Sequence, residues 1–213
     1  MAVEPVVPAP DASSPDACRR PGWIALARHG EPALSRRVTL NAEGYRRWWA
    51  TYEEGGILPD QEPPADLRAV AQSACVVLAS SRRRAVETAR AVVGDRPLAP
   101  DPLFIEAPLP PPPLPRWLRT GPKTWGFVSR CIWWFLRWTP PGEETRAEAE
   151  ARASRACDRL EATARTEGDV LLFAHGFFNA MLSRELKRRG WRQAQGRGWA
   201  YWSVKRFEPP ASA

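Results

Sequence analysis

Short apolar runs, each about the length of one β-strand, alternate along this chain with segments of helical pattern. The runs are Trp23–Ala27, Cys75–Ala79 and Val170–Ala174. Runs of this length, bounded by polar or turn residues, are typical of buried strands. Strands that alternate with helices predict a three-layer α/β/α sandwich with a mostly parallel central sheet. We also expect a short strand at Leu103–Ile105 and a final edge strand at Ala200–Phe207.

The 213 residues suffice for one large domain with an insertion. Residues 1–21 are rich in Pro, Ala, Ser and Asp without periodicity, and we expect a flexible N-terminal tail. The domain then spans 22–213, with the insertion at about 107–140.

The insertion has an unusual composition. Pro108–Pro115 must be extended, because proline fixes φ and lacks the N–H group. Phe127–Trp138 is apolar and aromatic, with two arginines, and is too short to span a membrane. Three roles stay open: a cap that shapes substrate access, a contact surface for a membrane or a partner at residues 126–138, and filler without function.

Several protein classes are excluded by what the sequence lacks. No apolar run approaches the ~20 residues of a spanning helix. Neither common nucleotide-binding loop is present, and the cysteines and two histidines form no zinc pattern. We therefore expect no metal and no cofactor. The scattered cysteines, Cys18, Cys75, Cys131 and Cys157, favour reduced thiols in the cytoplasm.

The chain carries a net charge of +7, nearly all from arginine. Arginine suits anionic partners, since its guanidinium binds phosphate and carboxylate in a bidentate manner. The basic residues are scattered rather than clustered, so nucleic acid is not an expected partner. The charge alone decides little.

Polar residues follow the predicted strands where ligands bind in open α/β sheets, at the carboxyl ends. The candidates are Arg28 and His29, then Ser80, Ser81 and Arg84, then Glu106, and finally His175. Both histidines of the chain stand at such ends, and each is followed by Gly, which allows a sharp turn and close approach of a ligand. We expect the two serines to cap a helix.

Residues of these types can together transfer a phosphoryl group. A neutral imidazole can attack phosphorus and form a covalent phosphohistidine. Arginines can hold the phosphate oxygens, and a second histidine can bind the transferring group. A carboxylic acid can protonate the leaving oxygen.

These motifs resemble those of a known family. Arg28–Glu31 (RHGE), Ser80–Ala89 (SSRRRAVETA), Glu106 and Ala174–Gly176 (AHG) resemble, in order, the motifs of the histidine phosphatase superfamily, the phosphoglycerate mutase-like proteins. Leu40–Trp48 and Pro141–Thr145 resemble two further segments of that family. The resemblance implies a phosphoglycerate mutase-like fold and a phosphoric monoester hydrolase of bacterial type.

The resemblance also assigns roles. It implies that His29 is the nucleophile and that Glu106 is the general acid and later the base. Arg28, Arg84 and His175 would form the phosphate pocket. Arg84 follows Arg82 and Arg83, and the family spacing selects Arg84.

The sequence departs from the family pattern at three places. Ser35 stands where the family often has Asn, and we expect it to contact phosphate instead. Pro32 replaces the usual Thr. After Glu106 the chain runs into polyproline, so the cap over the site is unusual.

The predicted function is metal-independent hydrolysis of a small phosphomonoester through phosphohistidine on His29. Two alternatives stay open: a phosphoglycerate-type mutase that uses the same residues, and a non-catalytic basic binding module on the same scaffold. Any shared site requires the imidazoles of His29 and His175 to lie within about 3–6 Å of each other.

Overall fold

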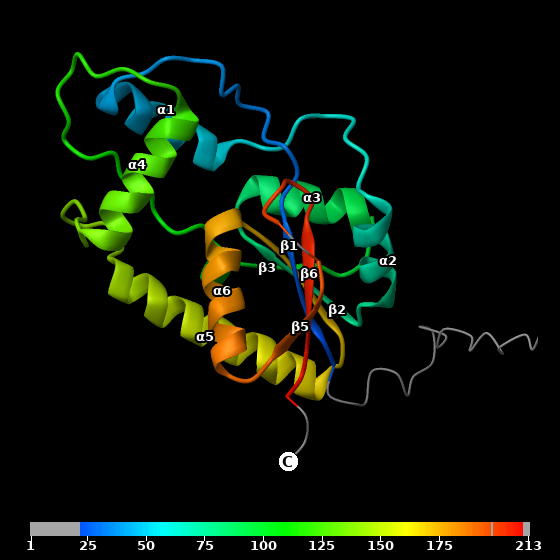
Figure 1. Ribbon diagram of the computed structural model, residues 1–213. Coiled ribbons are helices and arrows are strands. Elements are labelled where there is room, and N and C mark those ends of the chain that lie inside the picture. Colours follow the sequence, from blue (N-terminus) through cyan, green and yellow to red (C-terminus); the bar gives the residue numbers. More distant parts are fainter. Residues whose placement is uncertain (1–21, 197, 211–213) are drawn as a thin grey trace, which may run out of the picture.

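The computed structural model describes residues 22–196 and 198–210. A six-stranded sheet with the order β3-β2-β4-β1-β6-β5 forms its centre (Figure 1). The strands are β1 (Ile24–Arg28), β2 (Val76–Ser80), β3 (Ala99–Asp101), β4 (Val170–Ala174), β5 (Arg192–Gln195) and β6 (Val204–Glu208). The first four are parallel, whereas β6 is antiparallel to both of its neighbours. The predicted, mostly parallel sheet is confirmed.

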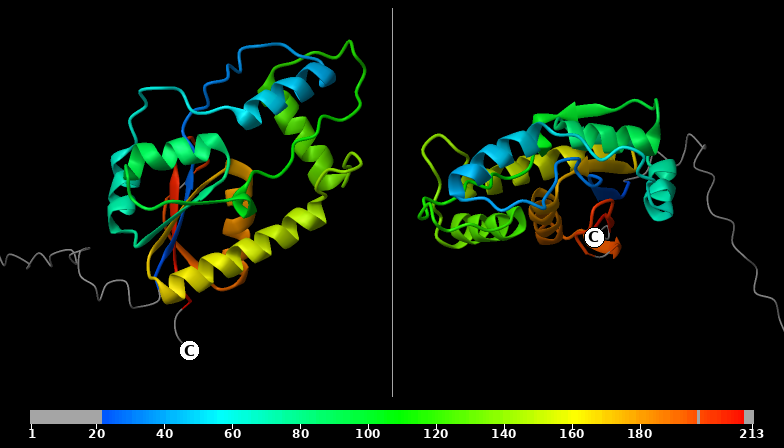
Figure 2. Two further views of the ribbon diagram at one scale, coloured as in Figure 1. Left: turned by 180° about the vertical axis from the view of Figure 1, so that it is seen from behind. Right: turned by 90° about the horizontal axis from the view of Figure 1, so that it is seen from above.

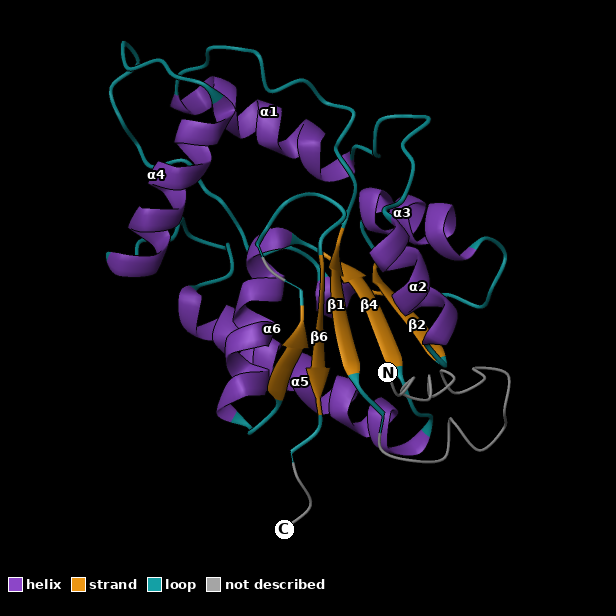
Figure 3. Cartoon of the chain, turned by 45° about the vertical axis from the view of Figure 1, so that its right-hand side comes forward, coloured by secondary structure: helices purple, strands orange, loops and turns teal. Residues whose placement is uncertain are grey.

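Helices cover both faces of this sheet. They are α1 (Ala42–Glu54), α2 (Ala65–Ser73), α3 (Arg83–Val93), α4 (Pro122–Phe135), α5 (Arg146–Thr166) and α6 (Gly176–Arg188), with a 3₁₀ turn at Pro102–Phe104. Apolar residues of α2 and α3 pack on one face and those of α5 and α6 on the other (Figure 3). The predicted three layers are therefore present, while α1 and α4 lie together beyond the sheet (Figure 2).

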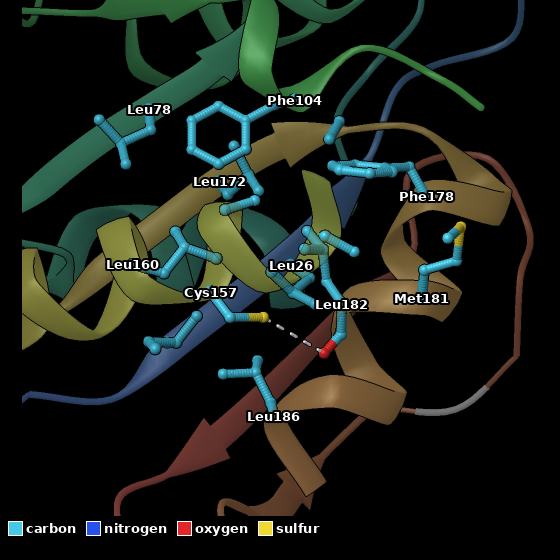
Figure 4. Close-up of a cluster of buried hydrophobic side chains, with 14 of the residues drawn as sticks. Leu26, Leu78, Phe104, Cys157, Leu160, Leu172, Phe178, Met181, Leu182 and Leu186 are labelled. Carbon is cyan, nitrogen blue, oxygen red and sulfur yellow. Dashed lines mark hydrogen bonds between the residues drawn. The ribbon is translucent and has the colours of Figure 1, made fainter. Parts of the chain in front are cut away.

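Local sequence explains where these helices begin. The Asn41 side chain accepts the N–H of Gly44 at 2.9 Å and caps α1. Thr145 and Glu148 cap α5 reciprocally, so that helix begins after the Pro-Gly segment. Along α5 the buried face carries alanines, among them Ala149 and Ala156, which let the helix approach the sheet closely. Figure 4 shows this core, with Cys157 of α5 contacting the Leu182 carbonyl of α6.

Two strand predictions are wrong. Leu103–Ile105 is not a strand, because Pro102 opens a 3₁₀ turn and the Asp101 side chain accepts the N–H of Leu103. The strand of this region, β3, ends just before that turn. The last strand, β6, is not an edge strand either, since β5 adds beyond it.

The thiols also differ from expectation. Cys131 and Cys157 are free, and burial raises the pKa of Cys157 to about 12. Cys75 is disulfide-bonded, so the expectation of reduced thiols is wrong for this residue. Cys18 and the predicted tail lie outside the described residues.

The region predicted as an insertion contains α4. Trp125 of this helix donates to the Leu40 carbonyl at 2.7 Å, and Leu40 and Thr120 form an isolated antiparallel bridge. These contacts attach α4 to the segment that leads into α1. Within the part of the chain that the structure describes, no helix is long and apolar enough to cross a membrane.

Candidate active site

The two histidines leave neighbouring strands side by side. Arg28 of β1 pairs with Ala174 of β4 in the sheet register, and His29 and His175 are the next residues. The His29 N–H donates to the Ala174 carbonyl at 3.0 Å. The ring centroids lie 5.3 Å apart, within the predicted range, and the side chains are 2% and 0% exposed. Both histidines therefore belong to one buried site at the carboxyl end of the sheet.

The His29 imidazole is neutral and has a defined tautomer. Burial lowers its pKa well below the usual value, and the positive charges of Arg84, Arg28 and Arg36 lower it further. Its Nδ1 lies 2.7 Å from the Gly30 carbonyl oxygen. A carbonyl can only accept, so Nδ1 carries the proton and Nε2 keeps a lone pair. This is the protonation state that a nucleophilic imidazole requires.

His175 is also neutral, because burial and then the charge of Arg84 lower its pKa well below the usual value. Its Nε2 lies 2.8 Å from the Ser80 hydroxyl. That hydroxyl also accepts the N–H of Arg82 at 3.3 Å. Ser80 thus orients the ring of His175. The prediction that Ser80 and Ser81 cap the following helix is wrong, because Arg82 is the N-cap of α3 and no side chain caps that helix.

Of the three consecutive arginines, Arg84 is the one buried beside the histidines. It is fully buried, and it donates to the Glu53 carboxylate at 2.6 Å and to the Tyr52 carbonyl at 3.0 Å. Arg83 instead pairs with Glu87 at the surface. The ion pair with Glu53 fixes the Arg84 guanidinium in place.

Arg28 is held by contacts with the C-terminal part of the chain. Its guanidinium donates to the Trp199 carbonyl and lies 4.4 Å from the centre of the Tyr201 ring. A Cβ on Gly176 would come within 3.1 Å of this guanidinium. Gly176 is therefore needed for close approach of Arg28.

Gly30 has a similar role. A Cβ there would lie 2.5 Å from the Trp202 ring. Neither Gly30 nor Gly176 has a positive φ, so a left-handed backbone is not the reason for glycine at these positions. The close approach predicted at these glycines is made by protein side chains.

Glu106 lies at the N-terminus of α6, the helix that begins directly after His175. Its carboxylate accepts the N–H groups of Phe178 at 2.8 Å, Phe177 at 3.1 Å and its neighbour Ala107 at 3.0 Å. A helix N-terminus favours a negatively charged partner. In this structure Glu106 is thus a cap of the helix that carries the second histidine.

Ser35 lies in the loop after the first motif. Its hydroxyl accepts the N–H of Arg37 at 3.2 Å, and it forms no hydrogen bond with either histidine within the described residues. The next residue, Arg36, lies closer to the proposed nucleophile, because its positive charge contributes to lowering the pKa of His29. Arg36 donates to the Tyr52 hydroxyl at 2.9 Å and lies 5.5 Å from the centre of the Tyr201 ring.

Sequence reasoning missed Arg36 and Tyr201. The ring of Tyr201 lies 5.6 Å from that of His29, and the guanidinium groups of Arg28 and Arg36 lie 4.4 Å and 5.5 Å from its centre. Arg36 could have been found as the residue next to the substituted family position. Tyr201 had no local signal, since its contacts with the first strand and its loop are all distant in sequence.

Several buried polar atoms around His29 have no hydrogen-bond partner among the described residues. They are Nε of Arg28, Nε of Arg36, Nε of Arg84, Nδ1 of His175 and the hydroxyl of Tyr201. Buried polar groups are nearly always hydrogen-bonded, so such a cluster requires an explanation. Guanidinium groups are donors only, and their partner has to be an acceptor, best an anion.

The described residues contain no group of three or more His, Cys, Asp or Glu side chains placed to hold a metal ion. The charge at this site comes instead from arginine. Its chemistry is that of an anion pocket.

A model of the histidine phosphatase superfamily (branch 1) matches residues 24–212. The chain therefore belongs to this family, as its motifs indicated. No curated protein sequence shows significant similarity to it.

Solved structures share the fold. An α-ribazole-5′-phosphate phosphatase from Escherichia coli is 18% identical, with a TM-score of 0.51 over 78% of this chain and 79% of the other. Phosphoserine phosphatase from Entamoeba histolytica, in complex with phosphoserine, is 14% identical, with a TM-score of 0.51 over 78% and 80%. The silkworm ecdysone phosphate phosphatase, in complex with tungstate, is 14% identical, with a TM-score of 0.53 over 90% and 95%. The phosphoglycerate mutase-like fold is thus confirmed.

Proposed function

We propose that this protein hydrolyses small phosphomonoesters through a covalent phosphohistidine on His29, without a metal ion. One observation carries the proposal. The Nδ1–H bond to the Gly30 carbonyl leaves a lone pair on Nε2, next to arginines whose Nε atoms have no partner. A nucleophile and an anion pocket therefore coincide.

Each residue then has a role in the reaction. His29 Nε2 attacks phosphorus, and the ester oxygen leaves. Arg28, Arg84 and His175 bind the transferring phosphoryl oxygens, where negative charge accumulates. Arg36 adds positive charge in place of the expected contact from Ser35. Water then cleaves phospho-His29 and restores the free imidazole.

Glu106 is the proposed proton donor to the leaving oxygen and the base for the attacking water. Three backbone N–H groups hold its carboxylate in place, and as the acid it would protonate the leaving oxygen. Glu106→Gln should therefore slow hydrolysis of an alkyl phosphate more than that of an aryl phosphate, whose leaving group needs no proton.

The family supports this activity. The structural relatives above include phosphatases, and one holds phosphoserine. All are below 25% identity, so none identifies the substrate of this chain. A small phosphorylated compound is the proposed partner.

The proposal is tested by release of phosphate from p-nitrophenyl phosphate in the presence of EDTA. Wild-type protein should turn over, and His29→Ala should lose about 10⁴-fold or more in kcat/KM, as expected for a nucleophile. Lys187→Ala, at the exposed end of α6, serves as the control for handling and folding. Equal rates for wild type and His29→Ala would exclude His29 as the nucleophile.

A mutase is the second candidate, favoured by the burial of His29, which is only 2% exposed. A mutase retains its phosphoenzyme and returns the phosphoryl group to the same carbon skeleton. Product analysis with phosphoglycerate separates the two: free phosphate without an isomeric ester excludes the mutase.

Residues 126–138 are a candidate surface for contact with a membrane. Phe127, Phe135 and Leu136 are more than 70% exposed, and Arg130 and Arg184 lie beside them around an apolar pocket of about 330 Å³. Apolar and basic side chains together favour an anionic lipid surface. Co-sedimentation with phosphatidylserine vesicles, reduced in Phe127→Ser/Phe135→Ser, tests this. Equal sedimentation with and without lipid would exclude it.

A cytoplasmic location remains part of the proposal. The free thiols of Cys131 and Cys157 favour it, whereas the disulfide at Cys75 counts against it. Thiol titration of protein extracted from cells under alkylating conditions shows whether Cys75 is reduced or disulfide-bonded there.

A further inference from the structure

A pocket of about 630 Å³ is lined mainly by the loop that follows the first motif, residues 31–37. Its lining includes Tyr201 and Arg36, which also border His29. The pocket therefore shares two of its lining residues with the surroundings of His29. Its volume is in the range of small-molecule sites, and the leaving group of a bound ester would extend into it.

The charged side chains of this pocket are mostly basic. Arg36, Arg37 and Lys123 line it, with Glu31 as the single acidic residue. Neither Arg37 nor Lys123 forms an ion pair with any described residue, and both are exposed. Arg36 is needed at the histidines, so Arg37 and Lys123 are cations in excess of what one phosphate requires.

The remaining walls are apolar or small, formed by Pro32, Ala33, Leu34 and Leu58, with Ser35 between them. Such walls suit a short carbon skeleton. Lys123 comes from the first turn of α4, in the segment predicted as an insertion. The insertion therefore contributes directly to the space where a leaving group lies.

We infer that this pocket is a second anion subsite, so that the substrate is a phosphomonoester whose alcohol part carries another anionic group. Arg37 and Lys123 bind that group, and Glu31 opposes it. This inference rests on the proposed function, since it takes His29 as the residue that attacks the ester. It gives α4 a role in selecting the substrate.

The test uses aryl phosphates that differ only in charge far from the ester. These are 4-(carbamoylmethyl)phenyl, 4-(carboxymethyl)phenyl and 4-(phosphonomethyl)phenyl phosphate, in which the methylene group insulates the leaving oxygen. Wild-type kcat/KM should rise from the amide to the carboxylate or the phosphonate by about tenfold, since bonds to charged groups are strong. The carboxylate and phosphonate arms show which anion the subsite prefers.

Variants then show which residues cause the preference for the anionic esters. Lys123→Ala and Arg37→Ala should each reduce the anion-to-amide ratio by about fivefold or more, whereas Lys187→Ala should leave the ratio unchanged. Glu31→Gln should raise the ratio, a change that damage to the fold cannot produce. An equal kcat/KM for all three esters, or a ratio that neither Lys123→Ala nor Arg37→Ala alters, overturns the subsite.

A binding measurement separates this inference from the proposed function. The three esters are titrated calorimetrically into His29→Ala protein, which cannot form the phosphoenzyme. Tighter binding of the anionic esters, lost in His29→Ala/Lys123→Ala, supports the subsite even if no ester is hydrolysed. Equal binding of amide, carboxylate and phosphonate contradicts it, whatever the turnover.

Discussion

The carboxyl edge of the sheet and helix α4 both invert the usual distribution of side chains, in opposite directions. At the sheet edge, Arg84, His29 and His175 are buried with donor atoms left unpaired nearby. On α4, Phe127 and Phe135 are 71% and 73% exposed. A globular protein normally buries apolar groups and exposes charge. The partners proposed for the two regions differ accordingly: an anionic phosphate ester at the sheet edge and a lipid surface at α4.

The comparison implies that the buried charge of Arg84 stabilises the fold at the sheet edge. Arg84→Gln should destabilise the fold by about 3–5 kcal/mol, because Glu53 loses its buried partner. It should also reduce kcat/KM by about 10²-fold or more through loss of phosphate binding. Arg82→Gln is the matched control, since Arg82 also pairs with Glu53, at 3.1 Å, but is partly exposed. It should cost about 0–1 kcal/mol. Urea denaturation of both variants measures the difference, and equal losses would show that burial of Arg84 is irrelevant.

Helix α4 should have one face whose side chains stabilise the fold and another whose side chains do not. Trp133 is fully buried against the main core, whereas Phe127 of the same helix is exposed. Trp133→Ala should cost about 3–5 kcal/mol of unfolding free energy. Phe127→Ala should stay within about 0.5 kcal/mol. A large loss in Phe127→Ala would mean that this face is covered by the protein itself.

The two regions should also respond differently to pH, since both histidines of the chain lie at the sheet edge. Their pKa values are lowered in the folded protein by burial and by Arg84. Below pH 6.5 the unfolded chain therefore binds protons that the folded protein does not, and stability falls as the pH drops. The fall continues to the lowered folded pKa values, with a limiting slope of about 1.4 kcal/mol per pH unit for each His.

Thermal denaturation between pH 7.5 and 5.5 measures this dependence. His175→Asn should remove about half of the slope, while Phe127→Ala should keep all of it. A wild-type stability that does not change across this window would contradict the neutral, buried state of both imidazoles.

The sequence predicted the parts of this site that depend on local order. His29, His175 and Arg84 each follow a strand or open a helix, so a short motif and the parallel sheet suffice to bring them together. Ser35 was expected at the phosphate, but the structure brings Arg36 near His29 instead. The path of the loop decides which of these two neighbouring residues faces the site, and the sequence does not reveal that path. Tyr201 could not be predicted, because it reaches the site only through the pairing of β6 with β1.

The structure of the insertion was harder to predict, for a different physical reason. Its apolar pattern describes a helix with a buried and an exposed aromatic face, and composition does not distinguish the two. The strand expected at Leu103–Ile105 failed because Pro102 and the Asp101 cap favour a 3₁₀ turn. The disulfide at Cys75 has no signal in cysteine spacing.

The central claim, that His29 carries the phosphoryl group, is tested most directly by trapping the intermediate. Protein is mixed with a ³²P-labelled ester, quenched in alkali, where phosphohistidine is stable, and digested for peptide mapping. We predict one labelled peptide, containing His29, in wild type and in Glu106→Gln, and no label in His29→Ala. Label at His175 instead, or hydrolysis by His29→Ala at the wild-type rate, would contradict the account.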